Sequence, residues 1–224
     1  MTHTMLCDFH THTCLSDGVL TAVELVRRAE VAGYDAIGLT DHSGAGSLER
    51  IVRECREDAE LVGRHWDITV LVGVELTHVP PESIPELAQK ARAAGAHYVA
   101  VHGETPVEPT CPGTNLAAVQ CPDVAYLCHP GLLTEQQAEL AAANEVFLEI
   151  TARKGHCYSN GHVAAVALFA GAKLLLGSDA HSPEDLLSKE SAGGILLGAG
   201  LDEERVEQVL VANARAFLDR FGSV

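Results

Sequence analysis

The 224-residue sequence contains few basic side chains: 15 Lys and Arg stand against 31 Asp and Glu, giving a formal net charge of −16. Aromatic residues make up only 4% of the chain, with a single Trp. Binding along nucleic-acid backbones or to anionic membranes needs clustered positive charge, and binding of single strands also uses stacked aromatic rings. The composition therefore argues against extended nucleic acid and against a membrane surface as partners.

Long apolar segments and paired cysteines are also absent from the sequence. The longest apolar run, residues 163–172, is about half of the roughly 20 residues that a membrane span needs. The N-terminus shows no basic segment followed by an apolar one, so no signal peptide is expected. The seven cysteines are an odd number without a Cys-x-x-Cys spacing, which argues against a disulfide framework and a zinc knuckle. We expect reduced, mostly buried thiols in a cytoplasmic protein.

The chain does contain short apolar runs rich in β-branched residues, which predict seven strands. These runs are residues 5–9, 36–40, 69–76, 98–102, 124–129, 146–150 and 173–177. Helical segments lie between them, with capping-box spacing at Thr21, Ser83 and Thr134. Strands of continuous hydrophobicity that alternate with helices predict a parallel α/β sheet, either open and doubly wound or closed into a barrel. We expect a single domain over residues 1–224.

Metal-ligand residue types follow these predicted strands. A single histidine at such a place is more often a hydrogen-bonded neighbour than a ligand, but here the pattern recurs along the whole chain. In a parallel barrel all these strand ends lie on one face, where unpaired carboxylates and imidazoles would be costly without cations. Nine residues are therefore candidate metal ligands: His10, His12, Asp17, His42, Glu75, His102, His129, Asp179 and His181.

Nine ligands suit two or three divalent ions, because a single transition metal takes four to six. Imidazole and carboxylate without thiolate fit Zn, Mn or Fe, or a mixture of them, whereas Ca and Mg prefer oxygen alone. Asp8 and Asp41 directly precede or neighbour candidate ligands, and we expect them to orient these ligands. The sequence leaves open which metals bind and whether a third ion is present.

The spacing of these residues resembles the PHP family, the polymerase and histidinol phosphatase domains. The resemblance rests on these motifs: Asp8-x-His10-x-His12-Thr, Ser16-Asp17-Gly18, Thr40-Asp41-His42, Gly73-Val-Glu75, His102, His129-Pro130 and Asp179-Ala-His181. It implies a distorted, TIM-like (β/α)7 barrel with the metal site at the carboxyl ends of the parallel strands.

The resemblance also implies how the ligands are shared. The first ion would be held by His10, His12, Glu75 and Asp179, with Glu75 bridging to a second ion on His102 and His129. The third would be held by Asp17, His42 and His181. Some family members carry a histidine beside the position of Asp17, where this chain has Gly18. The third ion is therefore expected to bind more weakly or to exchange more easily.

The activity implied by the resemblance is hydrolysis of small phosphoesters, as in a histidinol-phosphatase-like phosphomonoesterase. The attacking group would be a hydroxide bound by the di- or trinuclear cluster. Asp179, His181 and Glu75 are the catalytic candidates. Arg153, Lys154 and His156 follow the sixth strand on the same face and are expected to bind substrate, since a guanidinium suits a phosphate.

Several alternatives stay open at this point. A phosphodiesterase or phosphotriesterase on the same scaffold would use the same cluster, and exonuclease-type trimming of nucleic-acid ends needs only a short strand end to reach the metals. An amidohydrolase-like enzyme also begins with His-x-His on its first strand, but its bridging ligand is often a modified lysine on strand four, where this chain has His102. A metal-binding module without catalysis is a further possibility. The oligomeric state is not predicted.

Overall fold

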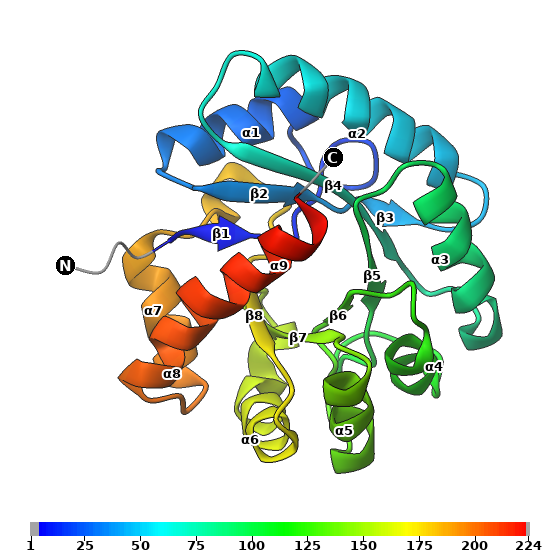
Figure 1. Cartoon of the computed structure of the whole chain (residues 1–224), viewed down its shortest axis with the longest axis vertical. Coiled ribbons are helices and arrows are strands. Elements are labelled where there is room, and N and C mark those ends of the chain that lie inside the picture. The colour runs from blue at the N-terminus through cyan, green and yellow to red at the C-terminus, as the bar shows by residue number, and fades with distance from the viewer. Residues whose placement is uncertain (1–4, 223–224) are drawn as a thin grey trace.

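A single parallel sheet forms the centre of the computed structural model, which describes residues 5–222 (Figure 1). Neighbouring strands follow the chain in the order β1-β2-β4-β5-β6-β7-β8. Their bounds are Cys7–Asp8 (β1), Ala36–Leu39 (β2), Thr69–Leu76 (β4), Tyr98–His102 (β5), Tyr126–Cys128 (β6), Phe147–Thr151 (β7) and Leu174–Gly177 (β8). Each predicted strand is present, and each pairing between neighbours is parallel.

Five of the strands begin or end one or two residues away from the predicted runs, and one further strand was not predicted. The first strand, Cys7–Asp8, is shorter than residues 5–9, and the backbone N–H of Leu6 just before it donates to the carboxylate of Asp35. An additional strand of two residues, β3 (His42–Ser43), pairs with β4 beyond the end of β2. Its register sets His42 directly opposite Glu75, so two candidate ligands are adjacent across the ladder.

The sheet closes on itself between its first and last strands. Residues after β1 and β8 meet in a parallel bridge between Thr11 and Ala180. The N–H of His12 donates to the carbonyl of Ala180 at 2.8 Å, and the N–H of Asp179 donates to the carbonyl of His10 at 2.9 Å. The result is a nearly closed barrel of seven parallel strands with helices around it, which confirms the TIM-like barrel and excludes the open, doubly wound sheet.

Helices connect successive strands and cover the outside of the barrel (Figure 1). Their bounds are Ala22–Val31 (α1), Leu48–Gly63 (α2), Ile84–Ala93 (α3), Thr114–Gln120 (α4), Glu135–Ala143 (α5), Asn160–Ala170 (α6), Lys189–Gly198 (α7), Glu203–Glu207 (α8) and Ala214–Phe221 (α9). The side chain of Thr21 caps α1, and Thr134 forms a full capping box with Gln137. The capping box expected at Ser83 is wrong: a 3-10 turn, Pro81–Ser83, precedes α3, and the Ser83 hydroxyl donates to the carbonyl of Pro80.

Aromatic side chains fill the end of the barrel where the strands begin. Phe217 of α9 is fully buried there, with ring centroids 4.5 Å from Phe9, 4.9 Å from Tyr98 and 5.2 Å from Phe147. In Figure 1, α9 (red) crosses over the strands at this end. Because this end is filled with apolar rings, the polar residues of the barrel interior are concentrated at the opposite, carboxyl end.

The sequence also makes predictions about the cysteines and about membrane-spanning segments. All seven cysteines are free thiols, and Cys7, Cys55, Cys121 and Cys128 are buried. Within residues 5–222, no helix combines the length and the apolar character that crossing a membrane requires.

Gly38 in β2 provides a test of how tightly the barrel interior is packed. A Cβ at this position would overlap the hydroxyl of Tyr98, which donates to the carbonyl of Phe9 at 2.7 Å, and would lie 2.9 Å from the Phe9 Cα. We expect Gly38→Ala to lower the free energy of unfolding by about 1–3 kcal/mol, since the buried Tyr98 must move. Urea denaturation at a fixed metal concentration measures this change.

The matched control is Gly193→Ala in α7, where a Cβ meets no atom within 4 Å. This substitution should leave stability unchanged or raise it by up to about 1 kcal/mol, because alanine favours a helix over glycine. Equal stabilities for the two variants would contradict the close packing described for the barrel interior.

Candidate metal centre

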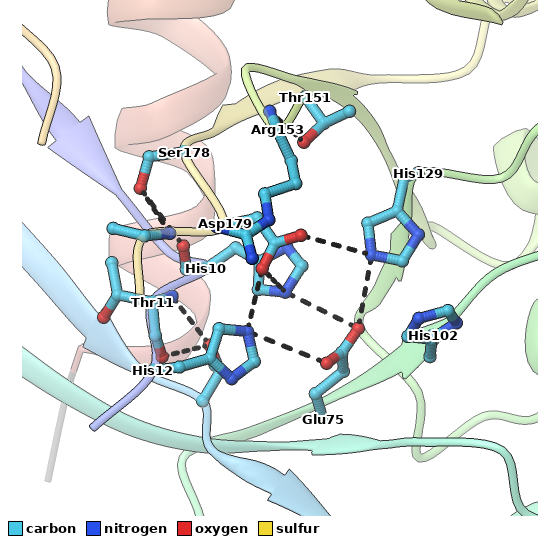
Figure 2. Close-up of polar contacts among 12 residues, drawn as sticks. His10, Thr11, His12, Glu75, His102, His129, Thr151, Arg153, Ser178 and Asp179 are labelled. Carbon is cyan, nitrogen blue, oxygen red and sulfur yellow. Dashed lines mark hydrogen bonds and ion pairs between the residues drawn. The ribbon is translucent and has the colours of Figure 1, made fainter. Parts of the chain in front are cut away.

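The nine candidate ligands lie around one mouth at the carboxyl end of the barrel. Six of them are buried, and Figure 2 shows several of these pointing toward one another: His10, His12, Glu75, His102, His129 and Asp179. The other three, Asp17, His42 and His181, lie toward the solvent side of the mouth. The structure therefore brings together the residues that the sequence places at separate strand ends.

One group of ligands lies on the seam where the barrel closes. The Asp179 Oδ1 atom is 3.1 Å from the Nε2 atom of His12 and 3.7 Å from the Nε2 atom of His10. Asp179 has a φ of 54°, in the left-handed region that a non-glycine residue rarely adopts. The backbone is thus held in a strained conformation at a ligand position, which is typical of functional sites.

Glu75 lies between the groups of ligands. Its Oε1 atom is 3.5 Å from the Nε2 atoms of both His10 and His129, and its Oε2 atom is 2.6 Å from the Nδ1 atom of His42. Burial alone would raise the pKa of this carboxyl, but the charges of His10 and His42 lower it well below its usual range. Glu75 is therefore a carboxylate, in a position that suits a bridging ligand.

A second group consists of His102, His129 and His156. Their ring nitrogens lie within 4.8 Å of one another, close enough to hold one ion. The ring centroids of His102 and His129 are 4.5 Å apart, and those of His129 and His156 are 4.4 Å apart. His156 was expected to bind substrate, and the structure places it beside two candidate ligands.

The third group combines Asp17, His42 and His181 with His12. The Oδ1 atom of Asp17 is 3.2 Å from His181 Nε2 and 3.6 Å from His42 Nε2. Burial raises the pKa of Asp17, but the hydrogen bond from His181 and the charge of His42 outweigh it and bring the pKa to about 2. The side chain of Asp17 is 56% exposed, so this group is the most open to solvent of the three.

Steric crowding explains why position 18 is a glycine. A Cβ at this position would overlap the carbonyl oxygen of His12 and lie 2.7 Å from its carbonyl carbon. The loop conformation therefore leaves no room for a side chain beside Asp17. A weaker third ion stays a prediction.

The buried donors themselves test whether metal ions fit this mouth. Nine buried side-chain atoms in the described residues lack a hydrogen-bond partner, and six of them belong to candidate ligands: His10 Nε2, both ring nitrogens of His12, Glu75 Oε1, His129 Nδ1 and Asp179 Oδ1. Four of these atoms, His10 Nε2, His12 Nε2, Glu75 Oε1 and Asp179 Oδ1, lie at ion-pair distances from other candidate ligands without the alignment of hydrogen bonds. Each such atom costs about 1–3 kcal/mol if nothing satisfies it. Nitrogen and oxygen donors aimed at shared points fit divalent transition-metal ions.

Glu149 lies behind the candidate ligands, and the sequence motifs assign it no role. Its buried Oε1 atom accepts from Tyr126 at 3.0 Å and lies 2.7 Å from His10 Nδ1, and its Oε2 atom accepts from the backbone of His129 at 2.7 Å. The carboxylate thus orients two ligands and leaves His10 Nε2 facing the mouth. An acid within the apolar run of β7 is the sequence feature that could have indicated it.

Asp8 and Asp41 hold backbone near the ligands and do not contact their rings. Asp8 accepts hydrogen bonds from the N–H groups of His10 and Ser178, each at 3.1 Å, and burial raises its pKa to about 6. Asp41 accepts from the backbone N–H groups of Thr13 and Ser16. The two carboxylates therefore position the loops that carry His10, His12 and Asp17.

The basic residues expected to bind substrate lie beside the mouth. The Arg153 guanidinium is 3.6 Å from the Asp185 carboxylate, and the side chain is 33% exposed. Arg153 and Lys154 line a cavity of about 760 Å³ that also includes Ser178, the residue before Asp179. This cavity adjoins the candidate metal centre.

The sequence of this chain is similar to those of several known proteins. An uncharacterised protein of Methanocaldococcus jannaschii is 45% identical over 217 residues, covering 96% of this chain and all of that protein. A probable phosphatase of a Thermoanaerobacter species is 27% identical over 96% of this chain and 94% of its own length. A 5′-3′ exoribonuclease of Haemophilus influenzae is 33% identical over 70 residues, 31% of this chain and 23% of that protein.

The family comparison agrees with the motifs and with the barrel. The model of the PHP domain matches residues 8–217, which include every candidate ligand. The chain belongs to the PHP domain family.

Proposed function

We propose that the protein is a metal-dependent phosphoesterase that hydrolyses small phosphomonoesters, in the manner of a histidinol phosphatase. The observation that carries this proposal is the gathering of three donor groups at one mouth, beside a cavity that Arg153 lines together with Ser178. Membership of the PHP family and similarity to a probable phosphatase over nearly the whole chain support it.

The chain's own residues would hold two or three divalent ions, of Zn, Mn or Fe. His10, His12 and Asp179 form the first position, and Glu75 connects it to the others. When bound, such ions polarise phosphoryl oxygens and lower the pKa of coordinated water. Three of them would outweigh the charge of the three ligand carboxylates, so an acidic protein can still attract a small anion.

Arg153 is proposed to bind a non-bridging oxygen of the phosphate, for which a planar guanidinium is well suited. Lys154 is proposed to add positive charge at the entrance. The adjoining cavity would hold the remainder of the substrate, and Glu184 and Asp185 also line it. Such a mixed lining favours a small leaving group that itself carries positive charge.

Two residues are proposed to move protons. Asp179 has one oxygen 3.1 Å from His12 and the other 3.7 Å from His129, and we assign it to take up the proton of the attacking water. His181 lies at the more open side of the mouth, 3.2 Å from Asp17, and is assigned to assist the leaving oxygen. Glu75 contributes by holding the ligand groups together.

Hydrolysis of phosphodiesters or triesters is the alternative that uses the same residues. Trimming of nucleic-acid ends is a second alternative, and the similarity to an exoribonuclease over 70 residues, 31% of this chain, favours it. The net charge of −16 supports the small substrate and argues against an extended nucleic acid. A cytoplasmic location stays a prediction.

A panel of phosphate esters tests the substrate class. Protein loaded with Zn²⁺, Mn²⁺ or Fe²⁺ should hydrolyse small monoesters, including amine-bearing ones, faster than p-nitrophenyl diesters or short oligoribonucleotides. Chelator-treated protein is the control and should be inactive until a divalent ion is returned. A preference for diesters or for oligonucleotide ends would overturn the monoesterase assignment, and inactivity on every ester would overturn the whole proposal.

Glu75→Gln tests the bridging position. Losing one charge between three imidazole groups should strongly reduce metal retention and abolish turnover of p-nitrophenyl phosphate, because the ligand groups then lack their shared carboxylate. Metal analysis by mass spectrometry and the ester assay measure both effects. Glu135→Gln, on the exposed surface of α5, is the control. Normal turnover by a metal-poor Glu75→Gln protein would refute the mechanism.

Arg153→Ala tests phosphate binding separately from metal binding. Loss of a charge-assisted hydrogen bond of about 1.5–3 kcal/mol should raise KM for a monoester by about 10- to 100-fold. Metal content should stay unchanged. Arg153→Lys should restore only part of the loss, because it cannot form the bidentate contact. Arg64→Ala at an exposed position is the control, and an Arg153→Ala protein with unchanged KM would exclude the assignment.

A further inference from the structure

Glu108 extends from the loop between β5 and α4 into the second group of ligands. Its Oε2 atom is 3.0 Å from His102 Nε2 and 3.1 Å from His78 Nε2, and its Oε1 atom is 3.3 Å from His156 Nε2. One carboxylate therefore contacts three imidazoles that come from three different strand-end segments. Neither the sequence motifs nor the expected ligand set includes Glu108.

The loop that carries Glu108 is tied down at its base. The Glu104 carboxylate accepts hydrogen bonds from the N–H groups of Gly113 at 3.0 Å and Asn115 at 2.9 Å. In return, the side-chain oxygen of Asn115 accepts from the Glu104 N–H at 2.9 Å, and its amide nitrogen donates to the Pro130 carbonyl. Three prolines within residues 105–113 further restrict the backbone. The loop is thus built to hold Glu108 over the mouth.

His156 is placed as firmly as Glu108. Its side chain is 8% exposed, and its Nδ1 atom is buried without a hydrogen-bond partner among the described residues. Gly155 precedes it with a φ of 89°, a conformation that favours glycine, and this turn carries His156 back toward His129. A buried imidazole with an unsatisfied nitrogen beside two candidate ligands points to a missing partner.

We propose that Glu108 and His156 are additional ligands of the second metal position, which thus has its own set of His102, His129, His156 and Glu108. Tetrahedral zinc bound at about 2.0–2.1 Å places its ligand atoms roughly 3.3 Å apart. The distance of 3.0 Å from Glu108 Oε2 to His102 Nε2 is close to that separation. The Oε1 atom of Glu108 faces His156 Nε2 at 3.3 Å, which leaves His156 Nδ1 as the nitrogen without a partner. The ion would then depend less on the bridge from Glu75.

The charges of Glu108 and His156 favour binding of a metal ion over binding of an anionic substrate. An exposed carboxylate at the entrance of a site for anions repels the substrate unless a cation neutralises it. His156 directs its Nε2 atom at that carboxylate, so the pair offers a phosphate no free positive group. Metal coordination accounts for the positions of both Glu108 and His156. This inference rests on the metal centre of the proposed function but not on the phosphoesterase reaction.

Metal binding by Glu108→Gln and His156→Gln proteins tests the inference directly. Zn²⁺ stoichiometry is measured by mass spectrometry and Zn²⁺ affinity by competition with a chromophoric chelator. One ion per chain should bind at least about 10-fold more weakly in each variant than in the wild type. In Co²⁺-loaded protein, the visible absorption of one ion should change, because a ligand has been removed.

His162→Gln is the matched control, since His162 lies in the same region of sequence but bonds to the Leu133 carbonyl instead of the cluster. Circular dichroism and urea denaturation of the ion-free proteins confirm that the variants fold. Wild-type Zn²⁺ stoichiometry, affinity and Co²⁺ absorption in both cluster variants would overturn the inference, whether or not KM changes. If the metal effects are found but no phosphoester is hydrolysed, the inference stands and the proposed function fails.

Discussion

Two backbone hydrogen bonds across the seam of the barrel connect the fold with the metal centre. They join His12 to Ala180 and Asp179 to His10, so the residues that close the sheet are the ligands themselves or their immediate neighbours. Closure places the Asp179 carboxylate 3.1 Å from His12 Nε2 and 3.7 Å from His10 Nε2, an arrangement that suits a bound cation. Ions that bind only this closed arrangement stabilise it by mass action. Closing the seam therefore also brings together the candidate ligands of the proposed first metal position.

The residues that orient the candidate ligands are themselves held by defined contacts. Glu149 contacts His10, Tyr126 and the backbone of His129, and Gly177 leaves the space that its carboxylate occupies, because a Cβ there would overlap Glu149 Oε1. A buried acid is tolerated here since every contact is a donor or an imidazole. The same barrel interior ends in apolar rings around Phe217, which confines the polar network to one end.

The strands and the candidate ligands could be predicted from the sequence because both follow from local rules. Buried parallel strands are continuous apolar runs, and a ligand such as Glu75 or His102 comes directly at a strand end. Glu108 could not be found this way: it lies six residues beyond the end of β5, and only the folded loop brings it to His102. The two-residue strand β3 was also missed, because its pairing with Glu75 depends on the path of the chain after β2.

The distribution of charge around the mouth gives the substrate one favourable direction of approach. Asp17 and Glu108 carry partly exposed carboxylates at the third and second positions. Arg153 and Lys154 are the basic residues beside the mouth, and the cavity that they line is adjacent to Asp179. Because Asp17 and Glu108 are proposed to bind ions, their charges would be neutralised, and Arg153 and Lys154 would attract an anion from the side of the cavity. A phosphate bound from this side places its leaving group in the cavity, so the volume and the mixed charge of that cavity, more than the shared ligand set, would select the substrate.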